Sequence, residues 1–299
     1  MKWPPMISMR QEFDSASLDD LEGELARGIR DRLARSQWEA GQSVAVGVGS
    51  RGVSPLRRVV STVVRELSAA GLKPFIVPAM GSHGGATAEG QRQVLAELGV
   101  TAEAVGAEIR ATMETVLLGK TPRGVEIYWD ANAFGADRVV VIGRVKPHTD
   151  FKGEIESGLC KITAVGLGKR KGAEKIHENG LAETIPEGAS VALATGKVLM
   201  GIALVENPFD QPAIVKVVGP DQFLQTDREL LALAKRMLPR IPTDSLHLLV
   251  VDEMGKNISG AGMDTNVVGM YRLLGYGERK PDYRYLAALR LTEASHGNA

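Results

Sequence analysis

The chain has 299 residues, 44% of them hydrophobic and 24% charged, which is enough to bury a full core and to form two domains. Lysine plus arginine equals aspartate plus glutamate at 36 each, so no overall charge draws the protein to nucleic acid or to an anionic membrane. A single cysteine excludes an internal disulfide, no apolar run reaches the roughly 18 residues that span a bilayer, and the N-terminal stretch lacks the apolar run of a signal peptide. These features predict a cytoplasmic protein in which any anion site is local.

Segments with helical and strand-like patterns alternate along the chain. Apolar residues at helical spacing predict helices at residues 17–39, 54–71, 87–99 and 227–238, and short apolar runs predict strands at 43–50, 73–80, 137–145 and 245–255. Alternation of this kind is typical of a parallel or mixed sheet flanked by helices on both faces. The predicted fold class is therefore α/β.

Capping and breaking residues set the expected boundaries of these elements. Ser17 and Ser54 are candidate N-caps, Pro55 suits the first helical position, and Gly71 suits a helix terminus. Two prolines and a polar pair make residues 239–245 a plausible linker. We therefore expect an N-terminal domain over 1–244 and the beginning of a second domain, which is incomplete, over 245–299.

Three predicted strands are followed by loops that carry a polar side chain. Arg51 follows the first strand, His83 lies in the sequence GSHGGAT after the second, and His148 lies in KPHTD after the third. Ligands of open α/β sheets bind beyond the carboxyl ends of strands, so these loops are the candidate site. Thr87 is placed to cap the next helix and leave its first amides facing an anion, although a tight turn with an exposed histidine is the alternative for His83.

The segment FKGEIESGLCKITAVGLG places Lys161 within an apolar, glycine-rich pattern. Four apolar residues predict one buried helical face, with Lys161 about two turns into the helix: Ile155, Leu159, Ile162 and Leu167. Burial would lower the pKa of a lysine there and free its amine as a nucleophile, whereas a stem that reaches solvent is the alternative.

A basic cluster and a histidine follow. Lys169, Arg170 and Lys171 lie beside glycines at an expected helix start, a setting that suits a phosphate, although runs of charge are usually solvated. A neutral imidazole at His177 could bind a metal, but no second histidine or cysteine stands at a recognisable ligand spacing. The sequence therefore predicts no ordinary zinc site.

The order GSHGGAT, GRVKPH, a helix-borne Lys161 and then His177 resembles the nickel-pincer-nucleotide lactate racemase family, over residues 40–272. In that family a lysine is joined to a pyridinium mononucleotide that holds nickel, and a downstream histidine also binds the metal. The resemblance implies that Lys161 carries the cofactor and that His177 is the metal ligand. It also implies that His83 and His148 are acid–base groups on opposite faces of the substrate, and that Arg51 binds the substrate.

The chain departs from the family in two places. The segment between His148 and Lys161 is longer than its family counterpart and lacks the usual glycine pair. The family's tyrosine and glutamine in the second domain fall on Val268 and Gly269, and its substrate lysine falls on Arg272. These differences indicate a divergent member with an altered pocket.

The resemblance implies an isomerase that racemises or epimerises a 2-hydroxy acid. Removing hydride from the substrate carbon avoids a proton that no side-chain base could take, and two histidines would explain inversion in both directions. The nickel-pincer nucleotide would come from separate biosynthetic proteins, with Lys169, Arg170 and Lys171 holding its phosphate. The alternative is a non-catalytic module that binds phosphate or a nucleotide.

Overall fold

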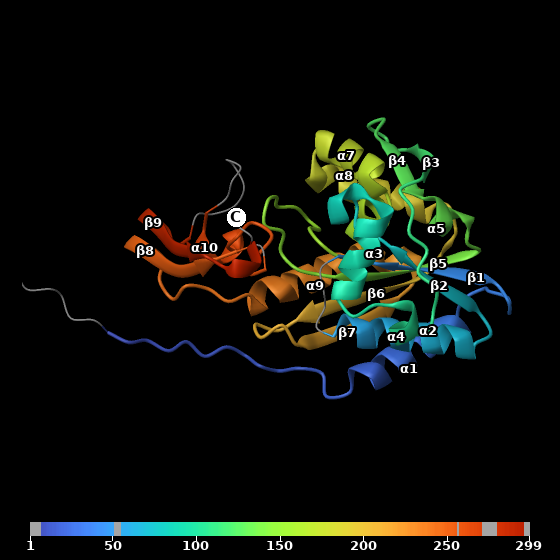
Figure 1. Cartoon of the computed structure of the whole chain (residues 1–299), viewed down its shortest axis with the longest axis horizontal. Helices are drawn as coiled ribbons and strands as arrows, with labels where there is room; N and C mark the ends of the chain where they lie inside the picture. The colour runs from blue at the N-terminus through green and yellow to red at the C-terminus, as the bar shows by residue number, and fades with distance from the viewer. Residues whose placement is uncertain (1–6, 51–54, 256, 271–279, 296–299) are drawn as a thin grey trace, which may run out of the picture.

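The computed structural model describes residues 7–50, 55–255, 257–270 and 280–295 (Figure 1). Its centre is a five-stranded sheet in the order β2-β1-β5-β6-β7. These strands are β1 (Ser43–Val48), β2 (Lys73–Pro78), β5 (Arg138–Arg144), β6 (Val198–Glu206) and β7 (Pro212–Val218). The first four are parallel, and β7 runs antiparallel to β6. The sheet confirms the predicted α/β class.

Strand β6 was not anticipated from the sequence, although it is buried at every position. Its run VLMGIALVE is apolar almost throughout, which is typical of a parallel strand covered on both faces. A short continuous apolar run has no period that separates a strand from a buried helix. The neighbouring strand β7 was missed as well, and only the pairing with β6 makes it part of the sheet.

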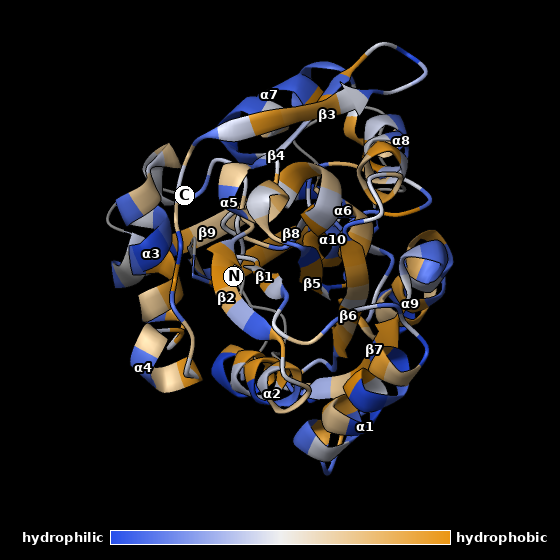
Figure 2. Cartoon of the chain, turned by 90° about the vertical axis from the view of Figure 1, so that its right-hand side faces the viewer, coloured by the Kyte–Doolittle hydropathy of each residue, from blue (hydrophilic) through white to orange (hydrophobic). Residues whose placement is uncertain are grey.

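Helices cover both faces of the sheet, and each layer has its own apolar core (Figure 2). One face carries α1 (Leu21–Ala34), α2 (Leu56–Ala69), α3 (Ala88–Glu97) and α4 (Ala102–Val105). The other carries α5 (Ala131–Gly135), α6 (Leu159–Lys161), α7 (Lys169–Glu178), α8 (Leu181–Leu193) and α9 (Phe223–Met237), together with the hairpin of β3 (Thr115–Lys120) and β4 (Glu126–Asp130). Residues alternate between the two cores along each strand, as Val46 and Ala45 do in β1.

Two of the predicted helix boundaries can be compared with the structure. Helix α1 begins later than expected, because Asp20 and not Ser17 is its N-cap and accepts a hydrogen bond from the Gly23 amide at 2.9 Å. Gly71 does lie just beyond the end of α2, with a φ of 86° that favours glycine. Ser54, the expected cap of α2, lies outside the described residues, and the helix itself begins at Leu56.

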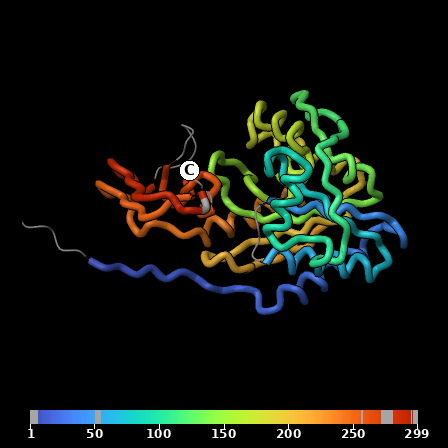
Figure 3. Tube along the Cα trace, viewed as in Figure 1, coloured from blue at the N-terminus to red at the C-terminus, as the bar shows by residue number. Residues whose placement is uncertain are grey.

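The C-terminal part forms a separate two-stranded parallel sheet from β8 (Ser245–Met254) and β9 (Asp282–Leu291), with α10 (Thr265–Val268) beside it (Figure 1). The stretch before α1 extends towards the end of the molecule that carries this sheet (Figure 3). Among the described helices, none has the length and apolar character needed to cross a membrane.

Candidate functional site

A cavity of about 260 Å³ lies at the carboxyl ends of β1, β2 and β5. The chain steps from β1 outward to β2 and later returns to β5 on the other side of β1, so the loops diverge at this point and leave a crevice. His83, His148, Lys161 and His177 all line this cavity. The structure thus brings together four predicted site residues, the first and last of which are 94 positions apart in the sequence.

The loop after β2 needs its glycines. Gly81 and Gly84 have φ values of 60° and 65°, and a Cβ on Gly84 would lie 2.6 Å from the backbone of Gly90. His83 is exposed, and its Nδ1 lies 2.5 Å from the Ser50 hydroxyl, which follows β1. Thr87 caps α3 as predicted, because its hydroxyl accepts from the Gly90 amide at 3.0 Å. The loop therefore presents a histidine that is oriented by a hydroxyl group.

Lys169 belongs to the fold and not to the cavity. It is fully buried, its Nζ lies 2.9 Å from Asp130 Oδ2, and it donates hydrogen bonds to Pro78 O at 2.5 Å and to Gln91 Oε1 at 2.9 Å. Burial lowers the pKa of Lys169, and burial raises the pKa of Asp130, since each charge leaves water. The expectation that Lys169 holds a phosphate is not met in this structure.

Gln91 links the buried ion pair of Lys169 and Asp130 to the loop that carries His83. Its Nε2 donates to Gly81 O at 2.9 Å and to His83 O at 3.3 Å, while its Oε1 accepts from Lys169. In the sequence, Gln91 lies within the first helical turn after GSHGGAT, and sequence reasoning did not use it.

The other two basic residues of the cluster also lie away from the cavity lining. Arg170 is exposed and pairs with Glu174 one helical turn later, at 2.7 Å. Lys171 lies over the ring of Tyr128, with its Nζ 4.3 Å from the centroid. The cluster does begin a helix, as predicted, but its side chains do not face the crevice.

Besides Lys161, basic side chains from the end of β5 and from the stretch after it line the cavity. Arg144, Lys146 and His148 alternate with buried residues along an extended stretch, so all three lie on one face. Arg144 is partly neutralised by the buried Glu206, at 2.6 Å. Strand β5 ends at Arg144, and Lys146 and His148 lie in the extended segment that follows it.

Lys161 lies in a first helical turn and not two turns into a helix. Helix α6 begins at Leu159, and the π-helical turn η2 (Ile162–Gly166) follows it directly. The carbonyl of Gly166 accepts from the Gly81 amide at 3.0 Å, which ties this turn to the loop of His83. A π-helical turn is rare and is found mostly at functional sites.

Asp227 of α9 caps the turn that carries Lys161. Its two carboxylate oxygens accept from the Leu159 and Cys160 amides at 2.9 and 2.8 Å. A Cβ on Gly158 would lie 2.2 Å from Asp227 Oδ1, so only glycine fits at that position. Burial raises the pKa of Asp227 to about 6 against the lowering effect of these hydrogen bonds. Sequence reasoning missed this carboxylate because it lies 66 residues after Lys161 (227 − 161).

His177 is an exposed residue in the last turn of α7. Its Nδ1 lies 2.6 Å from the Ala173 carbonyl, an acceptor without a proton, so Nδ1 carries the ring proton. The lone pair of the neutral ring is therefore on Nε2, the arrangement in which a histidine binds a metal. The described residues contain no group of three or more histidine, cysteine, aspartate or glutamate side chains that could hold a metal by themselves.

Two predicted substrate-binding residues, Arg51 and Arg272, lie outside the described residues. Val268 and Gly269 are described, and they form the end of α10 and its cap.

Two comparisons with known proteins relate this chain to lactate racemases. The chain is similar to the lactate racemase apoprotein from Thermoanaerobacterium thermosaccharolyticum, with 12% sequence identity and a TM-score of 0.51. The match covers 76% of this chain and 59% of that one, so the chain spans less than two thirds of its length. This likeness concerns the fold, and no curated protein matches the sequence. The model of the lactate racemase N-terminal domain, however, matches residues 19–185, more than half of the chain. The protein therefore belongs to the lactate racemase N-terminal domain family.

Proposed function

We propose that this protein is an isomerase that racemises or epimerises a 2-hydroxy acid, using a nickel-pincer nucleotide attached to Lys161. The observation that carries the proposal is the shared cavity lining of His83, His148, Lys161 and His177. The family membership supports a racemase-like protein. The substrate class and the cofactor are those that the resemblance of these residues to the nickel-pincer-nucleotide lactate racemase family implies.

The residues present suit such a cofactor. His177 offers one nitrogen ligand for a metal, through Nε2. Lys161 lines the same cavity and offers a primary amine for the covalent link. When bound, the cofactor would complete the nickel coordination and supply the hydride acceptor that the reaction needs.

The two cavity histidines have different partners. The Ser50 hydroxyl at His83 Nδ1 can either donate or accept, so His83 can present a lone pair on Nε2 and take the hydroxyl proton of a substrate. His148 Nδ1 instead accepts from the Asp150 amide at 3.1 Å, which leaves the ring proton on Nε2. In this conformation His83 is ready to act as a base, and His148 presents an N–H donor to a substrate oxygen.

The cavity also holds a cation for the substrate carboxylate. Lys146 shares a face with His148, and both side chains line the cavity. We assign Lys146 to the carboxylate, with Arg51 and Arg272 as the further candidates from the sequence. An acid–base histidine and a carboxylate-binding cation two residues apart would fix the orientation of a 2-hydroxy acid.

The test is whether Lys161 acquires the cofactor. The chain is co-expressed with the proteins that make the pincer nucleotide, in the presence of nickel, and its intact mass is measured. We expect added mass on the peptide that contains Lys161, and none in Lys161→Ala. Lys171→Ala is the matched control, because that lysine lies nearby in sequence but outside the cavity lining, and it should keep the adduct.

Absence of an adduct under these conditions would favour the non-catalytic anion-binding module. That module would then rely on the GSHGGAT loop, because Lys169, Arg170 and Lys171, which the sequence offered both to it and to the phosphate of the cofactor, lie outside the cavity lining.

A further inference from the structure

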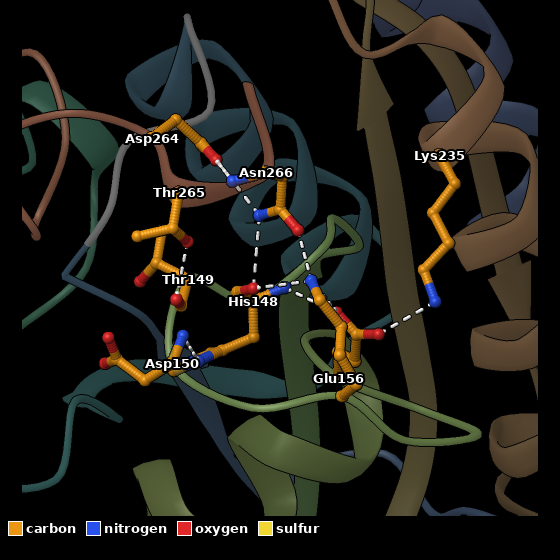
Figure 4. A network of polar contacts seen from close by, with 9 residues as sticks. His148, Thr149, Asp150, Glu156, Lys235, Asp264, Thr265 and Asn266 are labelled. Atoms are coloured by element: carbon orange, nitrogen blue, oxygen red, sulfur yellow. Dashed lines mark hydrogen bonds and ion pairs between the residues drawn. The ribbon is translucent and has the colours of Figure 1, made fainter. Parts of the chain in front are cut away.

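The loop that carries His148 is held through its backbone. The His148 amide donates to Glu156 Oε2 at 2.7 Å, and the Asp150 amide donates to His148 Nδ1 at 3.1 Å (Figure 4). Glu156 is fully buried, so the bond to its carboxylate is shielded from water. These two hydrogen bonds tie the orientation of the imidazole to the conformation of the loop.

Two lysines balance the buried charge of Glu156. Lys235 of α9 lies 2.8 Å from Oε1 (Figure 4). Lys152 lies 3.6 Å from Oε2. Lys152 also donates to His148 O at 3.1 Å. The same ammonium group thus contacts both the carboxylate that holds the loop and the loop itself.

The C-terminal part of the chain completes this network. Asn266 Nδ2 donates to His148 O at 3.1 Å, and Asn266 Oδ1 accepts a short hydrogen bond from Lys152. The Thr265 hydroxyl donates to Thr149 O at 2.6 Å, and Asp264 holds the Asn266 amide group at 3.0 Å. Figure 4 shows these side chains converging on the backbone of the His148 loop from the opposite side to Lys235.

No residue beyond His177 lines the cavity within the part of the chain that the structure describes. The C-terminal part therefore reaches the site through the loop, by contacts to the carbonyl groups of two consecutive residues, His148 and Thr149.

We propose that Asn266 is a positioning residue for His148: its amide clamps the His148 carbonyl, keeps the Asp150 amide on Nδ1 and thereby holds the ring proton on Nε2. The proposal deepens the proposed function, because it rests on His148 being an acid–base group of the reaction. It also makes the C-terminal part necessary for the site, since Asn266 is supplied from there.

The His148 carbonyl has two side-chain donors, Lys152 and Asn266, and Asn266 also accepts a hydrogen bond from Lys152. Loss of the Asn266 amide removes one donor directly and loosens the other. Without both, the turn from His148 to Asp150 is free to open, and the Nδ1 acceptor loses its backbone donor.

The experiment reads the histidine tautomer and the Asp150 amide in the protein without cofactor. In ¹⁵N-labelled wild-type protein, long-range proton–nitrogen spectra of neutral His148 should show the proton on Nε2. In Asn266→Ala we expect a mixture of tautomers and about 3- to 10-fold faster hydrogen exchange at the Asp150 amide, the effect of losing one hydrogen bond of typical net strength. Asn257→Ala is the matched control, because Asn257 accepts a hydrogen bond from Thr292 in the same part of the chain and is not part of the network described here.

A second variant separates positioning from loss of folding. Asn266→Asp keeps an oxygen for Lys152 but has no donor for the His148 carbonyl, so it should loosen the Asp150 amide as alanine does. Exchange at β1 amides such as Val46 should stay at the wild-type rate in both variants. An unchanged tautomer and an unchanged Asp150 exchange rate in both variants would overturn the positioning role.

An activity measurement keeps this proposal separate from the function. In the loaded enzyme, Asn266→Ala should lower kcat more than it changes KM, since a displaced acid–base group affects the transition state more than binding. If the tautomer shifts as expected but no 2-hydroxy acid is racemised even by the loaded wild type, the proposed function fails and the positioning role stands.

Discussion

Replacing Asp227 by asparagine would remove the buried carboxylate that caps the turn of Lys161. Asparagine has a similar shape and keeps one oxygen, so it can still accept from one of the Leu159 and Cys160 amides. What it loses is the ionisable group, and the pH dependence of the stability should change accordingly.

The size of the change follows from the pKa of Asp227, which burial raises from 3.8 to about 6 on folding. A carboxyl with a raised pKa in the folded state stabilises the protein at low pH, and this stabilisation is lost as the pH rises through about 6. Because the pKa of this group differs between the folded and unfolded states, it makes the unfolding free energy of the wild type about 2 kcal/mol higher at about pH 4.5 than at about pH 7.5. Asparagine does not titrate, so the variant lacks this contribution.

The assay is urea unfolding of both proteins at these two pH values. The difference in unfolding free energy, variant minus wild type, should rise by about 2 kcal/mol from the lower to the higher pH, because other titrating groups cancel in that difference. Asp19→Asn, a change at an exposed aspartate just before α1, controls for the substitution itself. A difference that is the same at both pH values would refute the argument that burial raises the pKa of this carboxyl.

Two further predictions concern the cavity and the buried ion pair. His83→Asn and His148→Asn should each retain the adduct on Lys161 but slow inversion by about 10²- to 10⁴-fold, as loss of acid–base assistance typically does, measured by label exchange between substrate enantiomers. An unchanged rate for either variant would contradict its role. Lys169→Met should destabilise the protein by about 3–5 kcal/mol, because it leaves the buried carboxylate of Asp130 without its ion-pair partner. Arg170→Ala removes a solvated ion pair and should cost about 1 kcal/mol or less. Thermal or urea unfolding measures both changes. Equal stability of these last two variants would show that the buried pair is not maintained in solution.

Local chemistry explains what could be predicted. Thr87 caps α3 because a threonine hydroxyl satisfies an amide three residues later, and Gly71 follows α2 because glycine adopts a positive φ without strain. The strand before His148 was predicted because an uninterrupted run of valine and isoleucine is typical of a buried strand. Each of these signals depends on residues within a few positions of one another.

Long-range pairing explains what could not be predicted. Lys169 sits in a run of three basic residues and was expected to be solvated or to bind a phosphate, yet Asp130, 39 positions earlier (169 − 130), holds it inside the core. Its neighbour Arg170, one position along the helix, points outward and pairs with Glu174. The sequence contains no local difference that assigns these two cations to opposite environments.

The sequence by itself therefore determined the α/β class and the elements with a clear local pattern, and it singled out His83, His148, Lys161 and His177 as candidate site residues through the order of their motifs. Only the tertiary structure decided which partner each of these side chains has: Ser50 for His83, the Asp150 amide for His148, and the Asp227 cap for the turn of Lys161. The physical reason is that a side chain's tautomer, charge and orientation are set by atoms within about 3 Å. Packing brings those atoms together from positions that are far apart in the chain.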